Sequence, residues 1–158
     1  MEIKSEKIIK DLLNSNIDWV KLSSVTYLPE SFIREFSDKV DWIGISEHQD
    51  LSEDFIREFQ DKVFWNFISG RQKLSEDFIR EFTDRVNWDN ISTFQLLSEN
   101  FIREHKDKVD WSRICNSQKL SEDFIKEFED RVDWDNISIY QKISDEFRKE
   151  FADKLNDK

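Results

Sequence analysis

A nucleophile and a base could be supplied in this chain by its one cysteine, Cys115, and its two histidines, His48 and His105. Such a pair works when the imidazole activates the thiol as a thiolate. Cys115, however, occupies a position that holds serine elsewhere in a repeating pattern described below, and His105 takes the place of a core phenylalanine. We therefore predict packing roles for these residues, no catalytic residues, and a protein that is not an enzyme.

Metal and cofactor chemistry has little support in the residue pattern. The stretch Asp133-Trp-Asp135-Asn136 has nearly alternating carboxylates, but it lacks the glycine and the terminal glutamate of a calcium-binding loop. With two glycines and one proline, the chain has no Gly-rich phosphate loop, zinc signature or nucleophile elbow. We expect no metal site and no cofactor.

The charge balance restricts the partners. The chain has 24 Lys and Arg against 35 Asp and Glu, a formal net charge of −11, which disfavours direct binding to nucleic acid or to an anionic membrane. Its single cysteine suits a reducing compartment, and no apolar run approaches the roughly 18 residues of a membrane span. The start, Met1 to Glu6, lacks the apolar core of a signal peptide, so we expect a cytoplasmic location.

An internal repeat of 23 residues dominates the sequence. Its first position and its tryptophan recur without insertion at Leu28, Leu51, Leu74, Leu97, Leu120 and Ile143, and at Trp19, Trp42, Trp65, Trp88, Trp111 and Trp134. Residues 28–142 make five full repeats, 1–27 a degenerate one, and 143–158 a half repeat.

Each repeat predicts two short helices. Phe78, Ile79 and Phe82 share one helical face, and Ser75 is placed to cap that helix. In the second half of a repeat, Asp133 is placed to cap a helix that begins at Trp134. Helices of about two turns are unstable alone in water, so neighbouring repeats must share a core. A single coiled coil is excluded because the apolar stripe rotates by roughly 140° per repeat.

The predicted fold class is therefore all-α, an α-solenoid of 23-residue two-helix repeats with N- and C-terminal capping helices, forming one domain over residues 1–158. In the half repeat, Arg148 replaces the isoleucine of the sixth position, as expected where no repeat follows. At the other end, Ser5 replaces the leucine of the first position. The sequence does not explain how the first helix ends, because no glycine stands after it.

Two phrases, Leu-Ser-Glu-Asp-Phe-Ile-Arg-Glu-Phe and Asp-Lys-Val-Asp-Trp-x-x-Ile-Ser-x-x-Gln, recur with small variations, as in residues 51–63 and 120–141. Over residues 28–155 the chain resembles the short helical repeats of uncharacterised proteins from large DNA viruses and phages. The resemblance implies a virus-encoded protein that acts inside a host cell, and it carries no activity to transfer. Pro29, in place of a capping serine, and Phe64 depart from the pattern.

Three recurring features have a structural and a functional interpretation. The acidic residues fit exposed helix pairs such as Glu53 with Arg57, but they could also make the chain a nucleic-acid mimic that blocks a DNA- or RNA-binding protein. The charge is uneven, −4 in residues 28–50 and +1 in residues 97–119, which disfavours the mimic. We expect the tryptophans to pack in the core instead of stacking on bases, and the recurring glutamines to hydrogen-bond between repeats.

Departures from the repeat mark the candidate site. Eleven of the 14 phenylalanines fill two core positions, and the others stand out. Variable positions on one flank of the second helices, away from the Trp–Ile face, are our candidates for partner binding: Phe64, Phe67, Arg71, Phe94, Arg113 and Tyr140. Drift on an exposed face would produce the same variation. We predict a monomeric scaffold for protein–protein interaction, acting as a viral or phage adaptor or as an inhibitor of a host factor.

Replacing Arg148 with isoleucine tests the capping interpretation. If the sixth position normally meets a following repeat, Arg148→Ile exposes an apolar end and promotes end-to-end association. Light scattering on the purified variant measures this. A variant as monodisperse as the parent would contradict the assignment of the sixth position.

Overall fold

A computed structural model describes residues 17–25 and 27–155 of the chain. The chain forms two compact units, Met1–Phe64 and Trp65–Lys158. Every regular element in the described residues is an α-helix, and the chain is an all-α solenoid of 23-residue repeats. Residues 1–16, which include most of the predicted N-terminal capping repeat, lie outside the described residues, and the single-domain organisation stays a prediction.

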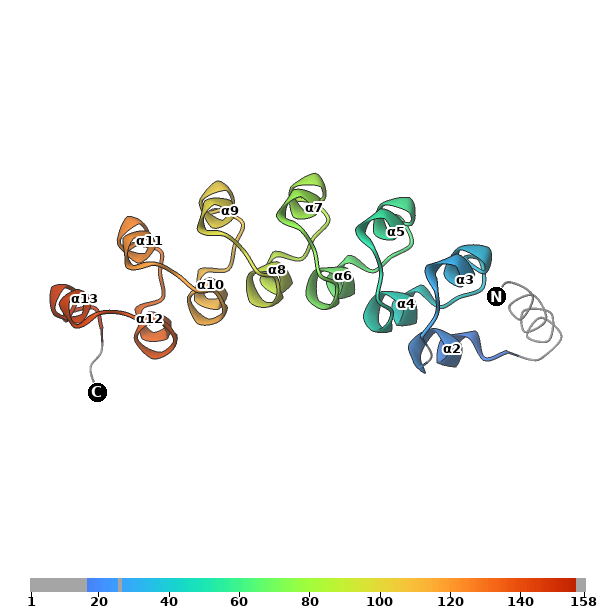
Figure 1. Cartoon of the computed structure of the whole chain (residues 1–158), viewed down its shortest axis with the longest axis horizontal. Coiled ribbons are helices and arrows are strands. Elements are labelled where there is room, and N and C mark those ends of the chain that lie inside the picture. Colours follow the sequence, from blue (N-terminus) through green and yellow to red (C-terminus); the bar gives the residue numbers. More distant parts are fainter. Residues whose placement is uncertain (1–16, 26, 156–158) are drawn as a thin grey trace. The chain divides into compact units, whose positions relative to one another are not determined.

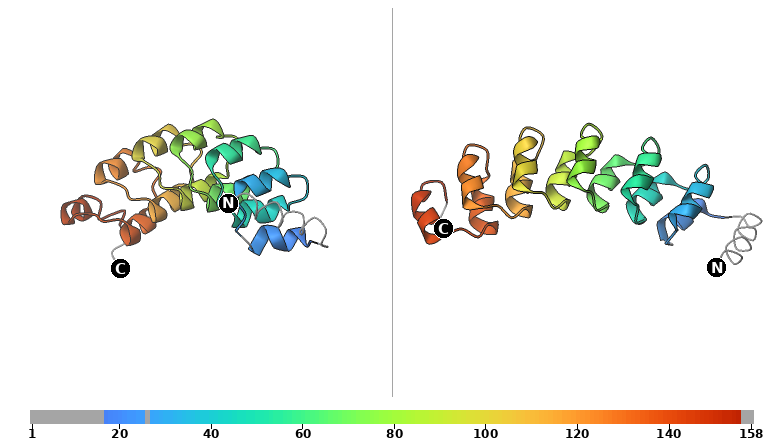
Figure 2. Two further views of the ribbon diagram at one scale, coloured as in Figure 1. Left: turned by 45° about the vertical axis from the view of Figure 1, so that its right-hand side comes forward. Right: turned by 45° about the horizontal axis from the view of Figure 1, so that its top comes forward.

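Each complete repeat contains a six-residue helix followed by a seven-residue helix. The first unit contains α2 (Trp19–Val25), α3 (Glu30–Glu35), α4 (Trp42–His48) and α5 (Glu53–Glu58). The second unit contains α6 (Trp65–Arg71), α7 (Glu76–Glu81), α8 (Trp88–Phe94), α9 (Glu99–Glu104), α10 (Trp111–Ser117), α11 (Glu122–Glu127), α12 (Trp134–Tyr140) and α13 (Asp145–Glu150). Within the second unit, the first helices of the repeats form one row and the second helices form another (Figures 1 and 2).

The predicted caps are present at both kinds of helix. The Ser75 hydroxyl accepts the backbone N–H of Phe78 at 3.2 Å, and the Asp133 carboxylate accepts that of Asn136 at 3.1 Å. Pro29 makes no such bond at the start of α3. These bonds satisfy N–H groups that have no partner within the helix. They explain why the helices that carry these caps begin where the sequence predicts.

A second hydrogen-bonded turn explains how the first helix ends without glycine. The carbonyl of Phe82 accepts the N–H groups of Arg85 at 2.9 Å and of Val86 at 3.1 Å, so the chain makes another tight turn directly after α7. No residue in the described part of the chain has a positive φ. The left-handed C-cap that favours glycine is therefore not used here.

The core lies between the two rows of helices. Phe78 and Ile79 of α7 and Ile91 of α8 are completely buried, and so are their counterparts in the other repeats of residues 51–142. The tryptophans are half-buried at the edge of this core. Trp88 stacks on Phe101 of the next repeat with 6.2 Å between ring centroids, and its Nε1 donates to the carbonyl of Thr83 at 3.1 Å. This packing supports the structural interpretation of the tryptophans.

Buried glutamines connect successive repeats, as predicted. The Gln95 Oε1 atom accepts the N–H of Leu74 at 3.1 Å, and its Nε2 atom donates to the carbonyls of Ser69 at 2.9 Å and Gln72 at 2.8 Å. Gln118 and Gln141 make the same three bonds one and two repeats later. We call this series the glutamine ladder. In the first unit, Gln49 bonds in the same way to Leu28 and Ser23.

Small residues allow the second helices to approach one another. The closest helix–helix packing is between α2 and α4 in the first unit, and along α6, α8, α10 and α12 in the second. The Ser92 hydroxyl of α8 accepts the N–H of Asp110, the residue that caps α10, at 3.0 Å. Ser69 bonds equivalently to Asn87. Each second helix therefore also helps to fix the start of the next one.

Replacing Gln118 with leucine tests the glutamine ladder. Gln118→Leu leaves the buried N–H of Leu97 and the buried carbonyls of Ser92 and Gln95 without these partners, so we expect a loss of about 3 kcal/mol in the free energy of unfolding. Urea denaturation measures this, with Asn116→Ala on the exposed surface of α10 as the control, expected to change stability by less than about 0.5 kcal/mol. Equal stability of both variants would show that the ladder contributes little.

Candidate functional site

Three of the four candidate aromatic residues lie on the outer flank of the second helices. Phe94, at the end of α8, has 63% of its surface exposed, and Tyr140, at the end of α12, has 55% exposed. Phe67, in the first turn of α6, is half-buried. Phe64 is exposed but precedes α6, because it stands at the position that Asp or Asn holds before other second helices. It is therefore not on the helix face that it was predicted to share with Phe67.

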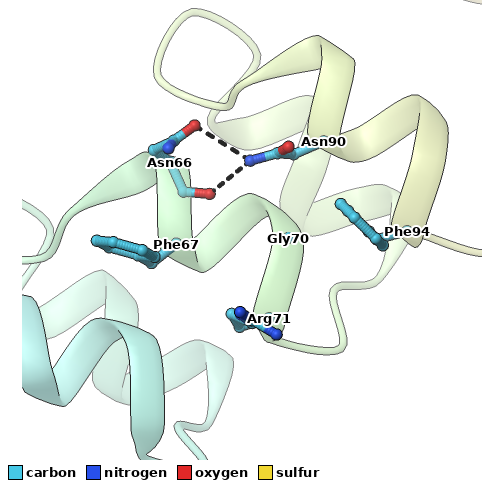
Figure 3. A pocket seen from close by; sticks show the side chains of 6 residues that line it. All are labelled: Asn66, Phe67, Gly70, Arg71, Asn90 and Phe94. Carbon is cyan, nitrogen blue, oxygen red and sulfur yellow. Dashed lines mark hydrogen bonds between the residues drawn. The ribbon is translucent and has the colours of Figure 1, made fainter. Parts of the chain in front are cut away.

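Three of the six candidates come together in one cavity. Phe67 and Arg71 of α6 and Phe94 of α8 line a surface cavity of about 280 Å³. In Figure 3, Phe67 and Phe94 lie on either side of α6, with Gly70 between them. The sequence prediction thus grouped side chains that the tertiary structure places at one site.

Sequence reasoning did not select the other three residues that line this cavity, Asn66, Gly70 and Asn90. The Asn90 Nδ2 atom donates to the backbone carbonyl of Asn66 at 2.8 Å and to its Oδ1 atom at 3.1 Å, which ties α8 to α6 at the cavity wall (Figure 3). A Cβ atom at Gly70 would lie 3.4 Å from the rings and amides of Phe94 and Asn90. The absence of a side chain at Gly70 therefore leaves the cavity open. Because the chain has only two glycines, this residue could have been selected from the sequence.

Tyr140 and Arg113 lie at other places on the same unit. Tyr140 lines a second cavity of about 520 Å³ with Ile139, Gln141 and Lys142 from the end of α12, and with residues 116–119 from the end of α10. Arg113, in α10, donates from Nη1 to the Thr93 hydroxyl at 3.1 Å and lies 3.4 Å from the Asp110 carboxylate. It lines neither cavity. The six candidates therefore do not form one continuous site.

Acidic residues contribute to the connections between repeats. The Glu76 carboxylate accepts the N–H of Ser98 at 2.6 Å, and the Arg80 Nε atom donates to Glu104 in the next repeat at 2.8 Å. This bond to Glu104 raises the pKa of the Arg80 guanidinium above its ordinary value. The predicted pair of Glu53 and Arg57 is also present, at 3.6 Å. A share of the carboxylates thus has a structural role.

Cys115 and the histidines each have partners of their own. The Cys115 thiol is buried, and its Sγ atom accepts the N–H of Asp133 at 3.3 Å, as the serine hydroxyls do in other repeats. Burial raises the pKa of this thiol to about 11. His105 stacks on Phe101 with its Nδ1 atom 3.0 Å from the Phe101 carbonyl, and His48 lies 3.6 Å from Glu47. These contacts agree with packing roles for Cys115 and His105.

No group of three or more His, Cys, Asp or Glu in the described residues is arranged to hold a metal ion. Asp133, the first carboxylate of the weak calcium-like stretch, is used in capping α12. Among the helices of residues 17–25 and 27–155, none has the length and apolar character needed to span a membrane.

Comparisons with known proteins leave the family open. No family model, curated protein or solved structure matches this chain. The resemblance to viral and phage repeats therefore stays an expectation from the sequence.

The reactivity of Cys115 provides a test of its buried position. A pKa of about 11, compared with an ordinary value near 9, lowers the thiolate fraction at pH 8 about 100-fold, and burial restricts access further. We expect the folded protein to react with a thiol reagent at least about 100-fold more slowly than the protein unfolded in guanidinium chloride. Because the unfolded thiol ionises first, folding stability should fall as pH rises from about 9 to 11. Rapid reaction of the folded protein at pH 8 would contradict the buried placement.

Proposed function

We propose that this chain is a non-enzymatic scaffold for protein–protein recognition, and that it binds its partner through the outer flank of the second helices. The sequence resemblance supports a viral or phage source, with a host protein as the partner. One observation carries the proposal. Phe67, Arg71 and Phe94, which depart from the repeat at variable positions, line the same surface cavity.

The residue types at this cavity suit protein recognition. Aromatic residues and arginine are enriched at protein interfaces, where a few such side chains account for most of the binding energy. The exposed ring of Phe94 gains hydrophobic stabilisation when a partner covers it. The hydrogen bonds from the Asn90 side-chain amide to Asn66 provide a polar rim beside the rings.

The backbone around the cavity is held in place by the glutamine ladder. Gln95 follows Phe94 directly, and its side chain bonds to Ser69 and Gln72 at the end of α6. A rigid surface loses little conformational entropy on binding, which increases affinity. The ladder therefore supports a preformed recognition surface across α6 and α8.

Removing the two aromatic rings tests the proposal. A partner is first isolated by pull-down from host lysate, identified by mass spectrometry and purified. We expect Phe67→Ala with Phe94→Ala to weaken its binding about 10- to 30-fold, with mild salt dependence, because the rings are desolvated anchors. Titration calorimetry at low and physiological salt measures this. Val20→Ala with Ile43→Ala, which truncates two exposed aliphatic side chains, serves as the control.

The same measurement distinguishes the scaffold proposal from the nucleic-acid mimic. A mimic binds through its carboxylates, so its affinity falls steeply with ionic strength. Neutralising Asp41, Glu47, Asp89 and Asp135 as Asn or Gln would then abolish binding, and the phenylalanine changes would have little effect. That result would replace the scaffold proposal with the mimic. Circular dichroism checks that every variant remains folded.

A further inference from the structure

One edge of the second unit has a charge opposite to that of the chain. This edge consists of the last residues of each second helix and the two residues that follow: 70–73, 93–96, 116–119 and 139–142. These segments contain four cations, Arg71, Lys73, Lys119 and Lys142, and no Asp or Glu, although the whole chain has a net charge of −11. We call them the basic edge.

The four segments lie next to one another in the fold. Gly70, Arg71 and Phe94 line one cavity, which places the ends of α6 and α8 side by side. Residues 116–119 and 139–142 line another, which does the same for α10 and α12. The Gln118 Nε2 atom bonds to the carbonyls of Ser92 and Gln95 and joins the end of α8 to that of α10. The basic edge is therefore continuous along the second unit.

The lysines of the basic edge differ from other cations of the same unit. Arg80, Arg103 and Lys126 each pair with a glutamate of the next repeat, at 2.5 to 2.8 Å. Lys73, Lys119 and Lys142 are exposed, and none of them forms an ion pair with a carboxylate in the described part of the chain. Their charge remains available to a partner.

The glutamine ladder reduces the negative charge at the ends of the second helices. The carbonyls at a helix C-terminus carry partial negative charge. In α6, α8 and α10, however, glutamine amides of the ladder donate to two of the carbonyls at each end. The three lysines therefore contribute the exposed positive charge of the edge.

Apolar side chains alternate with the cations. Leu96, near Phe94, has 90% of its surface exposed, and Ile139, next to Tyr140, has 68% exposed. In the other full repeats the position of Leu96 holds Asp50, Lys73, Lys119 or Lys142, and in the degenerate first repeat it holds Tyr27, which is also exposed. Apolar groups this exposed, flanked by cations, match a ligand with apolar and anionic side chains.

We propose that the basic edge binds an extended acidic segment of the partner protein, with apolar side chains of that segment packed beside Phe94 and Leu96 and beside Ile139 and Tyr140. This inference rests on the proposed function and names the partner class. Four neighbouring helices about 9 Å apart span about 27 Å, which an extended segment covers with about eight residues. A nucleic acid is disfavoured because a longer polyanion would be repelled by the acidic remainder of the chain.

A labelled peptide tests this assignment directly. The probe is a fluorescein-labelled peptide of about ten residues made of Glu, Asp, Phe and Leu, and the comparison peptide replaces Glu and Asp with Gln and Asn. We expect the full-length protein to bind the acidic peptide in fluorescence anisotropy and to bind the neutral one at least about tenfold more weakly. Lys119→Glu with Lys142→Glu should weaken binding of the acidic peptide about tenfold or more.

A matched pair controls for net charge. Lys106→Glu with Lys149→Glu makes the same charge change at exposed positions away from the edge and should leave binding within about twofold of the parent. Equal losses from both pairs, or no binding of the acidic peptide to the parent protein, would overturn the proposal. Preferential binding of an oligouridylate that is lost with the Lys119 and Lys142 changes would instead assign the edge to nucleic acid.

The purified partner distinguishes this inference from the proposed function. If partner binding is lost with the Phe67 and Phe94 changes but is unaffected by Lys119→Glu with Lys142→Glu, the basic edge is not the site for an acidic segment, and the scaffold function stands. Loss with both sets supports both proposals. If partner binding is unaffected by the Phe67 and Phe94 changes, the flank is not the binding surface.

Discussion

The bonds from one glutamine side chain to the preceding repeat are the constraint on which this fold depends. Helices of six or seven residues cannot satisfy their terminal backbone groups or remain stable alone. Gln95 helps with both problems, because its Oε1 atom accepts the N–H of Leu74 at the start of its own repeat and its Nε2 atom donates to two carbonyls of the preceding repeat. These bonds are buried, so a change of repeat length would leave several backbone groups unsatisfied. The invariant period of 23 residues follows from this geometry.

Other polar side chains serve the same purpose at the remaining repeat boundaries. The Ser92 hydroxyl accepts the backbone N–H of the residue that caps the next second helix. The Glu76 carboxylate accepts that of the residue that caps the next first helix. Much of the polar and acidic composition is thus needed for stacking. The side chains of Phe94 and Tyr140, at variable positions at the ends of second helices, form no hydrogen bond or ion pair with a neighbouring repeat in the described residues. This division between stacking residues and exposed variable residues explains why these two aromatic side chains can depart from the repeat.

The distribution of charge follows from the same division. Carboxylates cap second helices, accept N–H groups from the next repeat and pair with arginines across the first helices. At the ends of the second helices, glutamine amides donate to backbone carbonyls that would otherwise attract cations. Lys119 and Lys142 remain exposed there. An acidic chain therefore presents a locally basic, partly apolar edge. The net charge alone is a poor guide to what this surface binds.

The sequence by itself determined the fold class, the two helices of each repeat, their caps at residues such as Ser75 and Asp133, and the linking role of the glutamines, because these depend on local spacing and on an exact period. It also placed Phe67, Arg71 and Phe94 on one flank. Only the tertiary structure decided that these three share a cavity while Arg113 and Tyr140 lie elsewhere, and that Asn66, Gly70 and Asn90 complete the cavity. Those facts depend on which side chains of neighbouring repeats meet across a helix–helix contact, and positions 24 residues apart, such as Asn66 and Asn90, meet only when the repeats stack.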